Sequence, residues 1–185
     1  MHTVSNRTIV FNKHLRIEEA DISDAEHNTY KRERINREDA VAVLVWNTET
    51  NKVILTRQFR YAVYDKLNEN MIEVLAGKIE EEEPLQTAIR ETEEEIGYRL
   101  KPENIRLLAT CFPTPGYSTE RYFIYSATVT NADQVSEGGG LKEEHEDIEI
   151  VELVPEEFYR MLDAGEIMDA KTYIAGLLTA RHVAV

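Results

Sequence analysis

The sequence has few of the features that mark secreted or membrane proteins. It contains one cysteine, Cys111, among 185 residues, so an internal disulfide is excluded and a reducing compartment is expected. No apolar run approaches the roughly 20 residues of a membrane-spanning helix. The N-terminus, MHTVSNRTIVFNKH, also lacks the apolar segment of a signal peptide. We therefore expect a soluble, cytoplasmic protein.

Positive charge is also scarce. The chain has 21 lysines and arginines against 35 aspartates and glutamates, which gives a formal net charge of -14. Such a surface does not hold nucleic acid or an anionic membrane through its overall charge, so we expect neither as a partner. An anionic substrate would need local arginines and lysines, or a bound cation, to overcome this field.

The pattern of apolar residues predicts two parts. Residues 1–39 mix short β-prone runs with charge and read as a β meander with too little apolar content to stand alone. Residues 40–185 read as one domain in which strands lie on both sides of helices, which predicts an α/β sandwich with a mixed sheet. The expected strands are 41–46, 52–61, 71–75, 105–111, 122–129 and 148–154, and the expected helices are 84–96, 155–164 and 169–182.

The helix expected from Pro84 carries the clearest pattern. Proline suits the first helical turn, and Gly97 suits the position after the last. Apolar and small residues recur at helical spacing and predict one buried stripe. They are Leu85, Ala88, Ile89, Thr92 and Ile96.

Three glutamates of this helix, Glu91, Glu94 and Glu95, are spaced so that they share one face. Like charges at this spacing repel one another. Two interpretations remain open: a solvated acidic face, or a group of hard oxygen ligands for a cation such as Mg²⁺. The turn at Ala76–Gly77 favours the second by bringing a backbone carbonyl to the same end of the sheet, and Arg90 is available to orient one carboxylate.

The stretch RETEEEIGY, Arg90 to Tyr98, resembles the second half of the Nudix box. The first half is one residue shorter than the family pattern, so its glutamate is best placed at Glu82. Five further segments resemble the GDP-mannose pyrophosphatase branch of that family, which is related to the ADP-ribose pyrophosphatases. They are YKRE, LTRQFR, PGYSTE, the GGG that precedes EEHEDIEI, and GEIMDAKT.

The resemblance implies a Nudix-type α/β/α sandwich in residues 40–185, preceded by a β meander in residues 1–39 that serves dimerisation. It implies Mg²⁺-dependent hydrolysis of the diphosphate bond of a nucleotide sugar, with GDP-mannose giving GMP and mannose 1-phosphate. ADP-ribose or another nucleoside diphosphate sugar is the alternative substrate. A Nudix-like module that senses a nucleotide without cleaving it is the alternative of another class, and the intact glutamates of the box speak against it.

The same resemblance implies the metal site and the catalytic groups. The ligands of Mg²⁺, with Mn²⁺ as the alternative ion, would be the carbonyl of Ala76 and the carboxylates of Glu91, Glu95 and Glu146. Glu94 and Arg90 would assist. Glu144 would act as the general base, carried over the substrate by a flexible segment at Gly138–Gly140. An acidic surface loop is the other interpretation of EEHEDIE.

The substrate contacts implied by the resemblance are spread over the chain, and each cation among them has the alternative of an ordinary surface charge. They are Lys31, Arg32, Glu33, Arg60, Ala76, Gly77, Lys78, Glu120 and Lys171. Arg57, in contrast, is expected to pair with a glutamate. A homodimer that exchanges its N-terminal arm would bring Lys31, Arg32 and Glu33 to the partner's site.

Overall fold

The computed structural model describes residues 1–144 and 146–183, apart from the side chains of Glu144 and of residues 181–183. The described chain forms two compact units. The first comprises residues 1–39 and 112–121, and the second comprises residues 40–111 and those from 122 onward. None of the described helices is long and apolar enough to cross a membrane.

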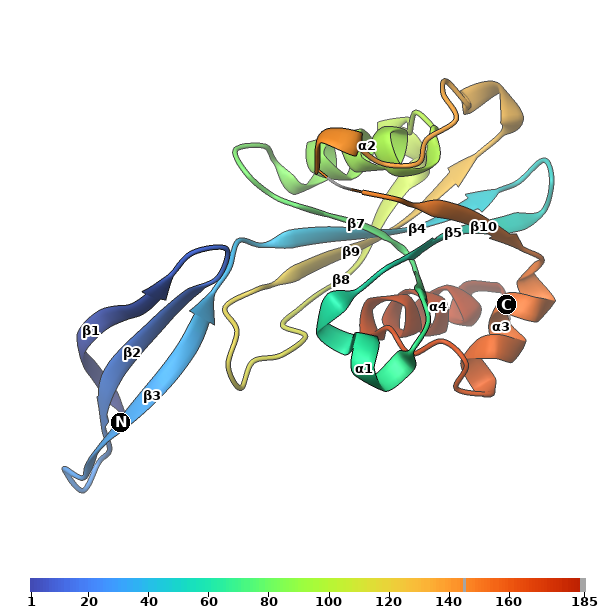
Figure 1. The fold of residues 1–185 in the computed structure, drawn as a ribbon. Helices are drawn as coiled ribbons and strands as arrows, with labels where there is room; N and C mark the ends of the chain where they lie inside the picture. Colours follow the sequence, from blue (N-terminus) through green and yellow to red (C-terminus); the bar gives the residue numbers. More distant parts are fainter. Residues whose placement is uncertain (145, 184–185) are drawn as a thin grey trace. The chain divides into compact units, whose positions relative to one another are not determined.

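The first unit is an antiparallel meander of β1 (Thr3–Asn12), β2 (Arg16–Ser23) and β3 (Thr29–Asn36), in that order (Figure 1). Residues 112–121 join it through the backbone of Ile35, whose N–H donates to the Tyr117 carbonyl at 2.7 Å. Every residue of β1 is exposed, and Ala20 is the one buried apolar residue described in β1–β3. The small buried content agrees with the low apolar content of this segment.

The second unit is built on a mixed sheet with the strand order β10-β5-β4-β9-β8. These strands are β4 (Ala40–Asn47), β5 (Lys52–Gln58), β8 (Ile105–Cys111), β9 (Tyr122–Val129) and β10 (Glu149–Leu153). The β4–β9 pair is parallel, whereas the other pairs along this path are antiparallel. Short 3-10 turns lie at Tyr61–Val63, Pro102–Asn104, Asn131–Asp133 and Lys142–Glu144.

Helices cover both faces of this sheet, α2 (Pro84–Ile96) on one face and α3 (Pro155–Asp163) with α4 (Ala170–Val183) on the other (Figure 1). Because side chains alternate along a strand, β4 contributes to two separate cores. Its Val41 and Val43 pack in the core beneath α2, and its Leu44 packs with Phe158 of α3. The predicted α/β/α sandwich with a mixed sheet is confirmed.

The segment expected as one strand, residues 71–75, is instead two strands separated at Val74. Strand β6 (Met71–Glu73) pairs with β5, and β7 (Leu75–Lys78) pairs with β4. The strand expected over 52–61 ends at Gln58 and is followed by the short helix α1 (Tyr64–Leu67). Apolar periodicity in so short a run does not show which neighbour each residue pairs with.

The 3-10 turn that follows β9, Asn131–Asp133, begins with a capping box formed by Thr130 and Asp133. Asp133 accepts hydrogen bonds from Lys101 and Thr130, and these bonds lower the pKa of its carboxyl to about 2. A carboxyl with a lowered pKa in the folded state stabilises the fold above its ordinary pKa and loses this contribution as the pH falls toward about 2. Asp133→Asn should lower the free energy of unfolding by about 1–2 kcal/mol at pH 7.

Urea denaturation of wild type and Asp133→Asn at pH 7, 5 and 3 measures this effect. The difference between the two proteins should shrink at pH 3, because the Asp133 carboxyl is largely protonated there in the unfolded chain, where its pKa is the ordinary 3.8, but not in the folded protein. An equal difference at all three pH values would contradict the electrostatic explanation. Asp163→Asn, in an exposed residue at the end of α3, provides the control.

Candidate active site

Helix α2 begins and ends as predicted. Pro84 occupies its first turn, and Gly97 follows its last residue in the left-handed region with φ 77°. The predicted stripe is confirmed: Ala88, Thr92 and Ile96 are fully buried, and Leu85 and Ile89 pack against the same core. The stripe fixes the rotation of the helix and thereby the direction in which its glutamates point.

Glycine at position 77 allows α2 to approach β7 closely. A Cβ atom at this position would lie 1.9 Å from Cδ of Glu91 and 2.1 Å from its Oε1. The Glu91 carboxylate therefore occupies the space that any other residue at position 77 would fill. This contact brings the carboxylate to the strand that carries the Ala76 carbonyl.

Glu95 lies deepest in this region. The residue is only 2% exposed, and its Oε2 atom has no hydrogen-bond partner among the described residues. Burial raises the pKa of this carboxyl well above its usual range, and the negative charges of Glu91 and Glu146 add to the rise. A buried carboxylate oxygen without a partner is costly, so this atom indicates a place where a cation fits.

Burial also raises the pKa of Glu91, to about 7, against the opposing effect of Arg90. Arg90 contacts three carboxylates: Glu82 at 3.1 Å, Glu91 at 2.8 Å and Glu94 at 2.8 Å. Burial alone would lower the pKa of its guanidinium, but these partners raise it above its ordinary value. Arg90 therefore orients the carboxylates around it, as the sequence predicted for one of them.

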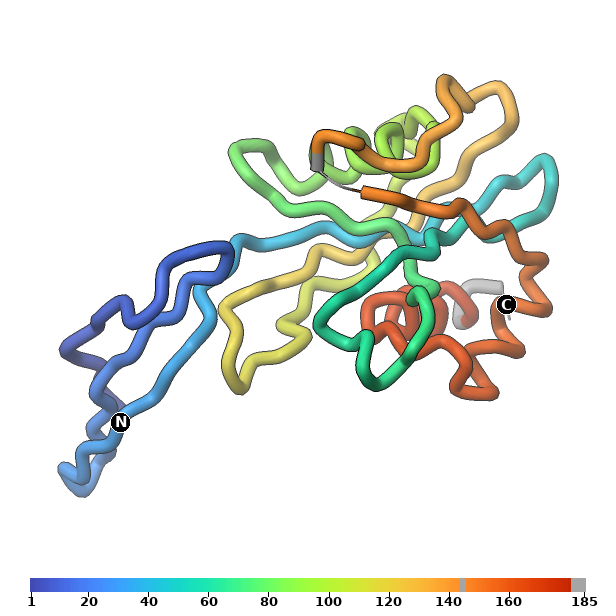
Figure 2. Tube along the Cα trace, viewed as in Figure 1, coloured from blue at the N-terminus to red at the C-terminus, as the bar shows by residue number. Residues whose placement is uncertain are grey.

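Residues 138–140 are hydrogen-bonded through their backbone to the C-terminal end of α2 (Figure 2). The N–H of Gly139 donates to the Glu95 carbonyl at 2.9 Å, and the N–H of Gly140 donates to the Glu94 carbonyl at 3.1 Å. Gly138–Gly140 all have positive φ, and a Cβ at Gly138 would lie 2.7 Å from the Glu95 carbonyl oxygen. The segment was predicted to be flexible; in the structure its backbone is hydrogen-bonded to the helix, and glycine at position 138 is needed for the close contact.

This glycine segment also places Glu146. The Oε2 atom of Glu146 accepts a hydrogen bond from the N–H of Leu141 at 3.0 Å. Its negative charge contributes to the raised pKa of both Glu91 and Glu95, after the larger effect of their burial. Among the described residues, no three His, Cys, Asp or Glu side chains are close enough together to enclose an ion. The side chain of Glu144, predicted as general base, lies outside the described residues.

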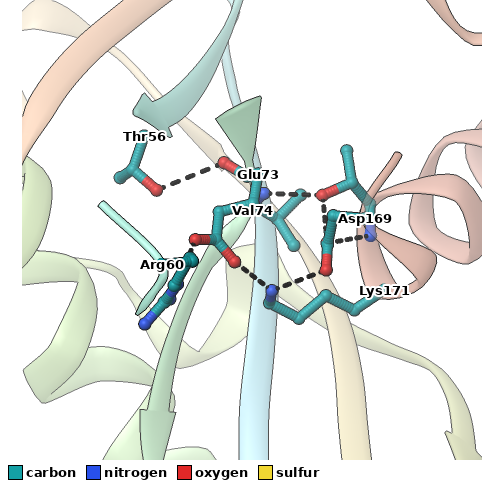
Figure 3. Close-up of polar contacts among 7 residues, drawn as sticks. Thr56, Arg60, Glu73, Val74, Asp169 and Lys171 are labelled. Carbon is teal, nitrogen blue, oxygen red and sulfur yellow. Dashed lines mark hydrogen bonds and ion pairs between the residues drawn. The ribbon is translucent and has the colours of Figure 1, made fainter. Parts of the chain in front are cut away.

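A second group of charges lies around Glu73, at the end of β6 (Figure 3). Its Oε1 accepts from Nε of Arg60 at 2.6 Å, and its Oε2 accepts from Nζ of Lys171. Nζ of Lys171 also donates to Oδ1 of Asp169 at 2.9 Å. Glu73 is 1% exposed and Lys171 is 7% exposed, so Arg60 is the member of this group that reaches the surface.

Hydrogen bonds link this charged group to the start of α4. Oδ2 of Asp169 accepts from the N–H and the hydroxyl of Thr172, at 2.9 and 2.6 Å. The Thr172 hydroxyl in turn accepts from the N–H of Val74 at 2.8 Å. Val74 follows Glu73 directly, so the hydrogen bonds form a closed ring that joins the β6–β7 junction to α4 (Figure 3).

Sequence reasoning identified Arg60 and Lys171 but missed Glu73, which joins them. The available signal was a single carboxylate inside the apolar run MIEVL, because a lone charge in a buried strand requires a partner. Lys78, another predicted substrate contact, lies exposed at the end of β7. Arg57 pairs with Glu149 at 2.8 Å, as predicted.

The remaining predicted contacts belong to the first unit. Lys31 pairs with Glu19, and the Arg32 guanidinium lies over the Tyr30 ring, 4.5 Å from its centre. Glu33 is exposed on β3. Glu120 accepts a hydrogen bond from Arg37 at 3.0 Å.

Comparison with known proteins shows which family the chain resembles. Residues 36–173 match the NUDIX domain family. The GDP-mannose pyrophosphatase of Escherichia coli (strain K12) is 35% identical over 153 residues, which are 82% of this chain and 78% of that protein. The GDP-mannose pyrophosphatase of Citrobacter koseri is 35% identical over 147 residues, which are 78% of this chain and 75% of that protein.

The fold has a counterpart among solved structures. A crystal structure of an ADP compounds hydrolase matches with a TM-score of 0.80 and 19% identity, over 99% of this chain and 94% of that chain. The fold match, the family match over residues 36–173 and the acidic helix α2 agree with one another. We conclude that the chain belongs to the Nudix family.

Proposed function

We propose that this protein hydrolyses the diphosphate bond of a nucleotide sugar, with GDP-mannose as the first candidate. Water would attack one phosphorus, the bond to the bridging oxygen would break, and GMP and mannose 1-phosphate would leave. The observation that carries the proposal is the buried Glu95 carboxylate on the helix of the Nudix box, with its unpartnered oxygen. The substrate is supported by the two relatives named GDP-mannose pyrophosphatase.

The oxygen donors around Glu95 suit a divalent cation, with Mg²⁺ as the first choice and Mn²⁺ as the alternative, although the described carboxylates would have to draw closer together to enclose it. The carbonyl of Ala76 and the carboxylates of Glu91, Glu95 and Glu146 would hold it, and oxygen ligands suit these hard ions. When bound, the ion would neutralise charge on the diphosphate and lower the pKa of a water molecule. The unpartnered oxygen of Glu95 and the mutual repulsion of the carboxylates support the assignment.

The chain's own groups would bind and orient the substrate. Arg90 would hold Glu91 and Glu94 in place through its two 2.8 Å contacts. Arg60 would grip a phosphate with the guanidinium nitrogens that Glu73 leaves free, since an arginine can bind phosphate oxygens bidentately. Lys171, next to Arg60 on Glu73, would contribute a second positive charge to the binding of the substrate. Glu144 would accept the proton of the attacking water.

The first unit would complete substrate recognition, with contacts from Lys31, Arg32, Glu33 and Glu120. We propose a homodimer in which residues 1–39 form the exchanged arm. The exposure of all of β1 supports this, because a partner subunit would supply the missing face.

The backbone at Ala76–Lys78 would contact the diphosphate. The free Cys111 fits a cytoplasmic location.

A phosphatase-coupled assay tests the function. GDP-mannose and ADP-ribose are supplied side by side, with Mg²⁺ or with EDTA, and the phosphate that a phosphatase releases from the products is measured. We expect turnover that requires Mg²⁺ and favours GDP-mannose. Turnover that favours ADP-ribose would overturn the substrate assignment. Binding of both nucleotides without turnover of either would indicate a sensing module instead.

Gly77→Ala should lower kcat/KM about a hundredfold, because the new methyl group would displace the Glu91 carboxylate and a misplacement of about 1 Å can have that effect. Steady-state kinetics measures the loss, and thermal unfolding verifies that the variant is folded. Gly116→Ala is the control, since a Cβ there meets nothing within 4 Å. Wild-type kinetics for Gly77→Ala would contradict the proposed place of Glu91 in the site.

A further inference from the structure

Glu73 holds two cations from distant parts of the chain, Arg60 after β5 and Lys171 in α4. Each of its carboxylate oxygens takes one of them. Lys171 has a second carboxylate partner in Asp169, whereas Glu73 is the only described ion-pair partner of Arg60. The position of the Arg60 guanidinium therefore depends on this one buried carboxylate.

The contact with Glu73 uses one edge of Arg60. The Nε atom donates to Glu73, whereas the two terminal nitrogens donate to no described residue. The Arg60 side chain is 40% exposed, so this end of the guanidinium is open to a ligand. Five donors in a rigid fork make a guanidinium held in this way a ready contact for phosphate oxygens.

Arg60 also lies within electrostatic range of Glu95, because the charge of each acts on the other. Oε2 of Glu95 nevertheless has no partner among the described residues. An arginine and a carboxylate that are free to meet form a strong, often bidentate pair. Without the Glu73 carboxylate, Arg60 would lose its described ion-pair partner, and Glu95 is the other carboxylate whose charge acts on it.

We propose that Glu73 is a positioning residue that holds Arg60 ready for a phosphate group of the substrate and keeps it away from Glu95. The inference rests on the proposed function for the phosphate and on the proposed cation site for Glu95. Glu73 contacts neither of these ligands and acts through Arg60. By binding Arg60 through Oε1, Glu73 keeps this positive charge at the phosphate site and apart from the negatively charged Glu95.

The test is a double-mutant cycle on Mn²⁺ binding, measured by calorimetry without substrate. Glu73→Gln keeps the shape of the side chain and removes its charge, so Arg60 is released while Lys171 keeps Asp169. Mn²⁺ affinity should fall about tenfold or more in Glu73→Gln and should stay near the wild-type value in Arg60→Ala. The double variant should bind Mn²⁺ like Arg60→Ala, because the competing cation is gone.

The KM for GDP-mannose provides the second readout. It should rise about tenfold or more in Glu73→Gln, in Arg60→Ala and in the double variant, since each lacks a positioned guanidinium. Glu149→Gln is the matched control: it releases Arg57 from an exposed pair in the same sheet, and Mn²⁺ affinity and KM should both remain at wild-type values. A general loss of structure would not be repaired by removing Arg60 as well.

Two outcomes would overturn the inference: wild-type Mn²⁺ affinity in Glu73→Gln, or an affinity that stays low in the double variant. If Glu73→Gln does not fold, Glu73→Asp replaces it, because a shorter carboxylate keeps the charge beside Lys171 but does not reach Arg60. The same rescue by Arg60→Ala is then required. The Mn²⁺ measurement needs no turnover, so it is decided separately from the proposed hydrolysis, which fails if the wild type cleaves no nucleotide sugar.

Discussion

Glu95→Gln should lower kcat/KM for GDP-mannose at least about a thousandfold and raise the unfolding temperature of the metal-free protein. Glutamine has nearly the same shape but no negative charge, so it is a poor ligand for Mg²⁺. The same change removes a buried carboxylate whose Oε2 has no partner and whose charge is repelled by Glu91 and Glu146. The free energy of unfolding in EDTA should therefore rise by about 1–3 kcal/mol.

The two effects are measured separately, turnover by the phosphatase-coupled assay and stability by thermal and urea unfolding in EDTA. Glu93→Gln is the matched control on the same helix, because Glu93 pairs with Arg99 at 2.8 Å on the exposed side. It should leave activity unchanged. An active Glu95→Gln variant would contradict the assignment of Glu95 as a ligand of the cation. A variant that is both inactive and less stable would show that Glu95 stabilises the fold.

Lys171→Met should lower the free energy of unfolding by about 3–5 kcal/mol. Lys171 is buried between Glu73 and Asp169, so its loss leaves buried carboxylate charge without its partner. Burial lowers the pKa of the Lys171 ammonium, but the charges of Glu73 and Asp169 outweigh this and raise it, which keeps the group charged at neutral pH. Urea denaturation at pH 7 measures the loss.

Lys52→Met is the control for Lys171→Met, because Lys52 pairs with Glu152 on the exposed edge of the sheet. It should change stability by less than about 0.5 kcal/mol. Adding Glu73→Gln to Lys171→Met should recover part of the loss, since neighbouring charges do not act additively. A loss near 0.5 kcal/mol in Lys171→Met would mean that the buried pair contributes little to the fold.

Local features of the sequence predicted α2 correctly. The proline at its start, the glycine after its end and the buried stripe depend on contacts within about one turn of the chain, which a single segment specifies by itself. The same local spacing placed Arg90 beside its carboxylates. Arg57 pairs with a glutamate, as predicted, because many carboxylates surround a cation on an acidic surface.

Other features depend on residues far apart in the chain. Val74 separates two strands that pair with different neighbours, although the run around it reads as one strand. Glu73 and Lys171 are 98 positions apart and meet only when α4 packs beneath the sheet. The glycines at 138–140 read as a flexible loop, yet their N–H groups bond to the end of α2.

The sequence by itself determined the family box, the helix that carries it and the identity of the acidic residues, because these depend on residue type and on spacing within one helix. Only the tertiary structure decided that Glu95 is buried with an unpartnered oxygen while Glu93, two positions away, is half-buried and forms a salt bridge with Arg99. It also decided that Glu73 holds Arg60. Burial and charge partners are properties of the packed sheet and helices, and no single segment of the chain contains them.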